Sequence, residues 1–160
     1  MFKKIAAAAV LVAASSAALA AGPQPFYAGI AATSTKIEGF DREGGYGAFF
    51  GYKFNQAIAI EGGYYRVAND LASSDITVDQ MDLSVIGTLP LSNGFDVYGR
   101  LGHNRAEFDS NASGYNATQS GAIYGLGLGY SFSPIVHGRL EVQKPASDTT
   151  KLVAGVAFRF

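Results

Sequence analysis

The stretch YGLGLGYSF, residues 124–132, alternates strictly between a large apolar or aromatic residue and a glycine or serine. A period of two residues sends successive side chains to opposite faces of a β-strand, so one face here is apolar and the other nearly bare. Glycine is also unfavourable inside a helix. The stretch therefore predicts a strand with one bulky face and one small face.

The same period recurs along the chain, and no stretch after residue 20 shows a convincing 3.6-residue apolar period. It predicts strands at residues 26–36, 45–54, 57–66, 80–89, 95–105, 121–132, 135–144 and 149–160. Tight turns occupy residues 55–56, 91–94 and 133–134, and longer polar links occupy residues 37–44, 67–79, 106–120 and 145–148. This alternation predicts an all-β fold, an eight-stranded antiparallel up-and-down β-barrel of the kind found in bacterial outer membranes.

The two faces of the predicted strands indicate which side of the barrel meets lipid. One face is apolar and carries no charge in any strand. The other combines many glycines with scattered charged residues: Lys53, Glu61, Asp82, Asp96, Arg100, His137, Arg139, Glu141, Lys151 and Arg159. Small and charged residues suit the lumen of a small barrel, which has room only for side chains. We therefore expect a transmembrane β-barrel with its apolar face in lipid, and keep a soluble, lipocalin-like barrel as the alternative.

Composition excludes several classes of function. The chain has 160 residues, 48% of them hydrophobic and 16% charged, with no cysteine and a net charge of −1. The absence of cysteine excludes a disulfide framework, a thiolate metal site and a cysteine nucleophile. The balanced charge excludes nucleic-acid binding by phosphate neutralisation. No cluster of His, Asp and Glu has the spacing of metal ligands, so no metal or other cofactor is expected.

The N-terminal residues predict export. Lys3 and Lys4 precede an apolar run at residues 5–14, and Ala18-Leu-Ala20 has the small-x-small pattern of a cleavage site. The apolar run is too short to cross a bilayer as a helix. We expect residues 1–20 to be a signal peptide and residues 21–160 to form an outer-membrane β-barrel domain, crossing the outer membrane of a Gram-negative cell several times.

Short strand sequences resemble the transmembrane domain of outer-membrane protein A. They are FYAG at 26–29, EGGY at 61–64, FDVYGRLG at 95–102 and RLE at 139–141. The ending VAFRF, residues 156–160, resembles the signal that the barrel assembly machinery recognises, with Phe158 and Phe160 as its aromatic residues. The resemblance implies a small barrel-only member of the family, with a structural or surface-interaction role in adhesion, serum resistance or envelope integrity.

Four charged residues on the lumen face, Glu61, Arg100, Arg139 and Glu141, lie a similar number of residues from the short turns. They can therefore share one height within the barrel, two acids with two bases, and buried charges of this kind must pair. Such pairs can plug the lumen, or they can act as the gate of a narrow pore for ions or small solutes. The resemblance implies an internal ion-pair network and leaves both interpretations open.

A lipid-modifying enzyme is the third hypothesis. In lipid A deacylases, serine follows histidine by two residues, but Arg105 and Arg139 hold those positions after His103 and His137. A palmitoyltransferase-like site could use His103, Asp109 and Ser110. The first predicted strand, however, follows directly after Pro25, without the amphipathic helix that precedes the barrel in that family. We therefore expect no enzyme activity.

Basic residues flank the long, acidic links: Lys36, Arg42, Arg66, Arg105 and Lys144. There they can meet lipopolysaccharide phosphates. The expected partners are outer-membrane lipids and lipopolysaccharide, the barrel assembly machinery and a ligand on a host surface. Because a closed barrel has no free strand edge, recognition of that ligand is expected from the links 67–79 and 106–120.

Deletion of Phe160 tests the assembly signal. We expect the deletion to reduce the amount of protein in outer-membrane preparations far more than the lost apolar contact would explain, because the assembly machinery recognises this residue during insertion. The measurement is the amount of barrel recovered in that fraction, and wild-type recovery would contradict the recognition signal.

Overall fold

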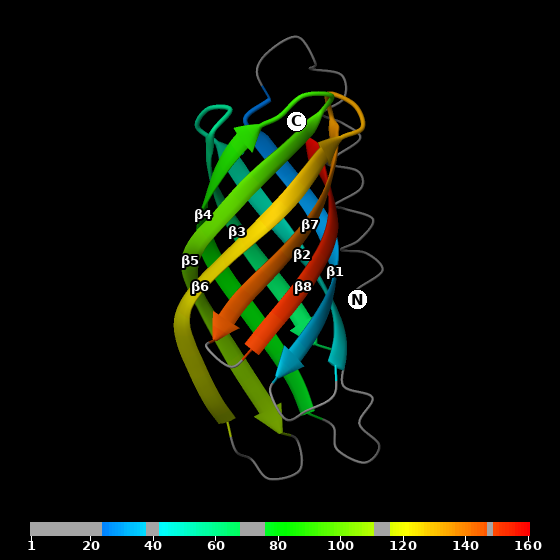
Figure 1. Ribbon diagram of the computed structural model, residues 1–160. Coiled ribbons are helices and arrows are strands. Elements are labelled where there is room, and N and C mark those ends of the chain that lie inside the picture. Colours follow the sequence, from blue (N-terminus) through cyan, green and yellow to red (C-terminus); the bar gives the residue numbers. More distant parts are fainter. Residues whose placement is uncertain (1–23, 38–41, 68–75, 111–115, 147–148) are drawn as a thin grey trace.

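The computed structural model describes residues 24–37, 42–67, 76–110, 116–146 and 149–160, so the expected signal peptide lies outside the described residues. Its strands, in chain order, are β1 (Phe26–Ile37), β2 (Arg42–Lys53), β3 (Ile58–Val67), β4 (Ile76–Pro90), β5 (Phe95–Ser110), β6 (Asn116–Ser131), β7 (Val136–Ala146) and β8 (Thr149–Arg159). Each strand pairs antiparallel with the next, and β8 pairs with β1 to close the barrel (Figure 1). The predicted eight-stranded β-barrel is confirmed. No described segment is a helix long and apolar enough to cross a membrane.

The two ends of the barrel differ, and we call them the turn end and the loop end. The three tight turns lie at the turn end, uppermost in Figure 1. In the β2–β3 turn, Asn55 Oδ1 accepts hydrogen bonds from the N–H groups of Ala57 and Ile58, both at 2.8 Å. In the β4–β5 turn, Asn93 and Gly94 have φ of 59° and 81°, a left-handed conformation that these residue types tolerate. These local features fix the register of the hairpins.

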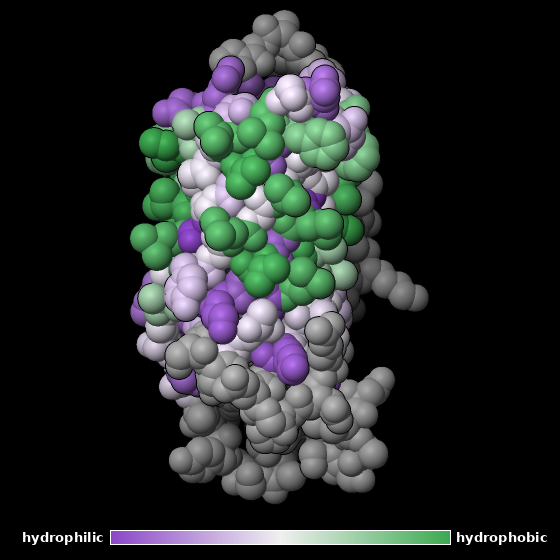
Figure 2. Space-filling model, viewed as in Figure 1, coloured by the Kyte–Doolittle hydropathy of each residue, from purple (hydrophilic) through white to green (hydrophobic). Residues whose placement is uncertain are grey.

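The outward face is apolar, as the alternation predicts. Leu126 is 71% exposed, Ile30 69% and Leu101 67%. Figure 2 shows such side chains gathered over the middle and the turn end of the face, with polar residues nearer the loop end. Aromatic rings meet near the turns, where Tyr130 lies 4.7 Å from Phe95 and 4.9 Å from Phe132 between ring centroids. An apolar surface of this extent suits lipid rather than water.

Side chains fill the lumen, and the aromatic side chains described there share one packing arrangement. Each lies over the glycine directly paired with it on the neighbouring strand, an arrangement that protects a glycine within a sheet. The pairs are Tyr27 with Gly51, Phe49 with Gly29, Tyr65 with Gly47, and Tyr98 with Gly127. The four aromatic side chains are buried. The glycines predicted to face the lumen therefore make room for particular rings.

Three strands run at least four residues further than the sequence pattern predicts. Residues 76–79, 106–110 and 116–120 were expected within polar links, but they extend β4, β5 and β6. Their pairing continues to Ile76 opposite Ser110 and Asp109 opposite Asn116. Beyond the membrane a strand has no need of an apolar face, because backbone pairing alone satisfies its polar groups. A polar sequence is therefore compatible with both a loop and such an extension.

One edge of this extension is open, which corrects the expectation that no free strand edge exists. Pairing of β6 with β7 begins at Tyr124 opposite Lys144, so no described residue of β7 pairs with residues 116–123 of β6. Pairing of β7 with β8 shifts register between Gln143 and Ala146, around Pro145. Proline has no N–H to donate to a sheet, which explains the irregularity at this point.

Gly51→Ala tests the ring-over-glycine packing. A methyl group at this position would overlap the Tyr27 ring, so we expect a loss of about 1–3 kcal/mol in the free energy of unfolding. The matched control is Gly87→Ala on the lipid face, where an added Cβ meets nothing within 4 Å. The measurement is a urea titration of both variants in lipid vesicles. Equal stability of the two would contradict the packing rule.

Candidate functional site

Arg100 lies at the centre of a cluster of charges inside the lumen. Its Nη2 donates to Glu61 Oε1 at 2.6 Å and its Nε to Glu141 Oε1, also at 2.6 Å. Its Nη1 donates to Asp82 Oδ1 at 3.1 Å. All four side chains have no exposed surface. One guanidinium thus connects carboxylates from β3, β4 and β7.

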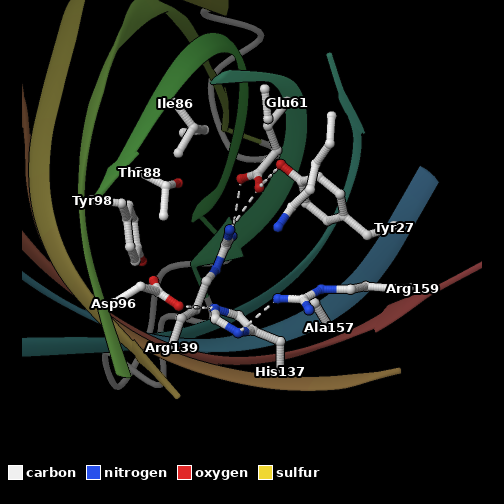
Figure 3. Close-up of a pocket in the computed structure, with 12 residues that line it drawn as sticks. Tyr27, Glu61, Ile86, Thr88, Asp96, Tyr98, His137, Arg139, Ala157 and Arg159 are labelled. Atoms are coloured by element: carbon white, nitrogen blue, oxygen red, sulfur yellow. Dashed lines mark hydrogen bonds and ion pairs between the residues drawn. The ribbon is translucent and has the colours of Figure 1, made fainter. Parts of the chain in front are cut away.

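Arg139 enters the same cluster from β7. Its Nη1 and Nη2 donate to the two oxygens of Glu61 at 2.6 and 3.0 Å, and its guanidinium carbon lies 3.5 Å from the centre of the Phe49 ring. The structure therefore brings together all four residues singled out from the sequence. Figure 3 shows Arg139 and Tyr27 both directed at the Glu61 carboxylate.

Two tyrosines complete the hydrogen bonding of the acids. Tyr27 donates to Glu61 Oε2 at 2.9 Å, and Tyr98 donates to Glu141 Oε2 at 3.1 Å. Buried charges are stable only when they are paired and hydrogen-bonded, and here donors on several strands satisfy both glutamates. Chemically, the arrangement can close the lumen and tie opposite walls of the barrel together.

Sequence reasoning placed Asp82 and Lys151 on the lumen face but left both out of the cluster. Asp82 adds a third carboxylate to the two arginines. Lys151, on the loop-end side, donates from Nζ to Gln80 Oε1 at 3.1 Å and lies 3.6 Å from the centre of the Tyr65 ring. With Lys151 the three acids face three bases. Strand parity identified both residues, but only the register of distant strands shows which charges meet.

The residues of the expected assembly signal lie at the turn end. Phe158 is 42% exposed on the lipid face. The Phe160 N–H donates to the Phe26 carbonyl at 2.9 Å, and their rings stack at 6.4 Å between centroids. Both positions are compatible with the expected role.

The residues considered for catalysis are not brought together into a visible site. His103 lies on β5 and is exposed. Asp109 and Ser110 also belong to β5, but their side chains lie outside those that the structure describes. Among the described residues, no group of three His, Asp or Glu side chains could hold a metal ion.

A double-mutant cycle on Glu61 and Arg139 tests the buried cluster. Removing either partner leaves a buried charge unpaired, so each single alanine variant should lose about 3–5 kcal/mol in the free energy of unfolding, and the double variant less than the sum. The control is the exposed ion pair between Arg105 Nη2 and Glu107 Oε1, 3.0 Å apart. The coupling energy of that pair should stay below about 1 kcal/mol. Refolding titrations measure both, and additive losses at Glu61 and Arg139 would contradict the coupling.

Comparison with solved structures finds small outer-membrane barrels. Neisserial surface protein A shares 22% identity, with a TM-score of 0.62 over 84% of this chain and 97% of that chain. The N-terminal barrel of Pseudomonas aeruginosa OprF shares 18%, with a TM-score of 0.60 over 84% and 97%. The Yersinia pestis attachment invasion locus protein Ail shares 18%, with a TM-score of 0.58 over 85% and 97%.

These likenesses agree in fold with the barrel described above. No curated protein matches the sequence. A family model, however, matches residues 6–160, almost the whole length of the sequence. The chain belongs to the outer membrane protein beta-barrel domain family.

Proposed function

We propose that this protein is exported by its signal peptide into the outer membrane of a Gram-negative cell and serves there in surface interaction, without enzyme activity. The observation that carries the proposal is the extension of β4, β5 and β6 at the loop end, which we call the ribbon (residues 76–79, 106–110 and 116–123). In Figure 1 the ribbon reaches beyond the ends of β7 and β8. Outer-membrane barrels have their longer connections outside the cell, so the ribbon faces the exterior.

The open edge of β6 gives the ribbon a means of recognition. The Ser131 N–H bonds to the Gly94 carbonyl on the β5 side, whereas the Phe132 N–H bonds to Val136 on the β7 side. Alternation along β6 therefore directs the N–H groups of Thr118, Ser120 and Ala122 away from β5, toward the uncovered side. An extended segment of a partner protein can add to such an edge by backbone hydrogen bonds.

The charges at the rim favour a protein partner over a sulfated saccharide. Ail of Yersinia pestis has been solved in complex with the heparin analogue sucrose octasulfate. Here Arg66 bonds to Asp79 at 2.7 Å and Arg105 to Glu107 at 3.0 Å, so two rim arginines already have carboxylate partners. Lys36 and Lys144 make no ion pair with a described residue, and we propose them for contact with lipopolysaccharide phosphates; the side chain of Arg42 lies outside those that the structure describes.

The narrow pore remains the alternative to this role. It requires the Arg100 cluster to open, although its side chains are fully buried and paired. Conductance in planar bilayers separates the two roles, because a plugged barrel carries no steady current.

Ser120→Pro tests recognition at the ribbon edge. Proline removes the N–H that faces the open side and leaves the hydrogen bonds to β5 in place, so the barrel should fold while binding to host cells falls at least about tenfold. Ser120→Ala is the matched control, because it keeps the N–H and loses only the hydroxyl. Adhesion of cells expressing each variant measures the effect.

Two results would count against the proposal. Wild-type adhesion by Ser120→Pro would exclude strand addition at this edge. A second variant combines Ser120→Pro with replacement of residues 68–75 and 111–115 by tight turns. If this variant keeps full adhesion and serum resistance, the function must depend on the lumen.

A further inference from the structure

A cavity of about 50 Å³ lies inside the lumen on the turn-end side of the Arg100 cluster. Its lining includes six ionisable side chains, those of Lys53, Glu61, Asp96, His137, Arg139 and Arg159, together with two tyrosines, Thr88 and the apolar Ala59, Ile86 and Ala157. Figure 3 labels most of them. The cavity shares Lys53, Asp96 and Arg159 with an open vestibule of about 970 Å³ between the turns. A small group can therefore enter the cavity from the turn end, while a larger molecule attached to it stays in the vestibule.

The cationic groups of this cavity exceed the acids available to them. Lys53 makes no ion pair or hydrogen bond with any described side chain, and Arg159 donates from Nη2 only to the neutral atoms Ser131 Oγ, at 3.4 Å, and His137 Nδ1, at 3.2 Å. The one acid at this level, Asp96, lies 3.7 Å from His137 Nε2. Glu61, deeper in, already accepts bonds from both cluster arginines.

Arg139 supplies a donor that the cluster does not use. Its side chain is 6% exposed, and its Nε is buried without a partner among the described residues. Two contacts hold it in place, the bidentate pair with Glu61 and the stacking on Phe49. Because Arg139 also lines the cavity, its positive charge favours an anion bound there.

Gly129 also helps to set the walls of the cavity. Gly129 pairs with Asp96 on one side and with Arg139 on the other. A Cβ at Gly129 would overlap Asp96 Oδ1 and His137 Nε2, so only glycine lets these two side chains lie over the strand. The walls of the cavity are thus set by backbone packing as well as by charge.

We propose that this cavity is a binding site for a small oxyanion, the phosphate or carboxylate group of a periplasmic solute. The oxyanion accepts hydrogen bonds from the Lys53 ammonium and the Arg159 guanidinium, and it lies beside the positive charge of Arg139. The volume admits a group of a few heavy atoms, because a cavity needs roughly 10–15 Å³ for each water-sized occupant. The site lies at the opposite end of the barrel from the ribbon, so it is independent of surface interaction.

The test titrates inorganic phosphate, and separately acetate, into the folded mature protein in zwitterionic detergent, followed by amide NMR shifts. We expect saturable shifts confined to residues around Gly129 and Arg159. Lys53→Gln should weaken binding at least about tenfold, the effect of losing one charge-assisted hydrogen bond. Asp96→Asn removes the nearby negative charge and should tighten binding. The matched control, Arg105→Gln at the loop end, where Arg105 is already paired with Glu107, should bind as wild type.

The arms of this experiment distinguish the ligand class and guard against misfolding. Saturation by phosphate alone assigns a phosphate group, and saturation by acetate alone assigns a carboxylate. Non-saturating shifts that chloride reproduces, or equal weakening by Lys53→Gln and Arg105→Gln, would overturn the site and leave the cavity to water. Circular dichroism verifies that each variant is folded. Failure here leaves surface interaction untouched, because the adhesion assay depends on Ser120 and not on this cavity.

Discussion

The enclosure of Arg100 by Glu61, Asp82 and Glu141 is the constraint on which the rest of the barrel depends. A charge surrounded by lipid is tolerated only if its partners are held in place, and here the partners come from three other strands. The register of each strand must therefore be correct for the cluster to form. The inner wall in turn needs small residues near the cluster, and Gly125 supplies one, since a Cβ there would lie 2.7 Å from Glu141 Oε1.

The barrel inverts the usual distribution of side chains in a soluble protein. Apolar residues face outward, where lipid replaces a core, and the interior holds ion pairs and aromatic rings beside a few aliphatic side chains. Packing inside is therefore directional, because each ring needs its glycine and each carboxylate its donors. A two-residue slip would keep lipid and lumen faces correct, yet it would place Tyr27 opposite a residue other than Gly51. Lumen contacts thus specify register more closely than the lipid face does.

Sequence alone predicted the strand count, the facing of the strands and the tight turns, because each of these depends on residues close together in the chain. The alternation of side chains placed Glu61, Arg100, Arg139 and Glu141 on the inner wall. It could not show that Arg100 also reaches Asp82, because that contact depends on how far each strand is shifted along its neighbour. The extension of β6 was mistaken for a link, since a strand outside lipid has no apolar signature. The cavity beside Arg139 depends on how side chains from seven strands fit together, and no local pattern reports that.

The long sequence separations within the cluster bear on the order of folding. Arg139 and Glu61 are 78 residues apart, and Arg100 and Glu61 are 39 apart, so no single hairpin contains a complete set of partners. The hairpins can pair while these charges are still hydrated, and the charges lose water only as the cylinder closes. Interactions formed after the rate-limiting step slow unfolding without speeding folding. A cluster completed at that late stage would chiefly slow unfolding and so lengthen the lifetime of the inserted barrel.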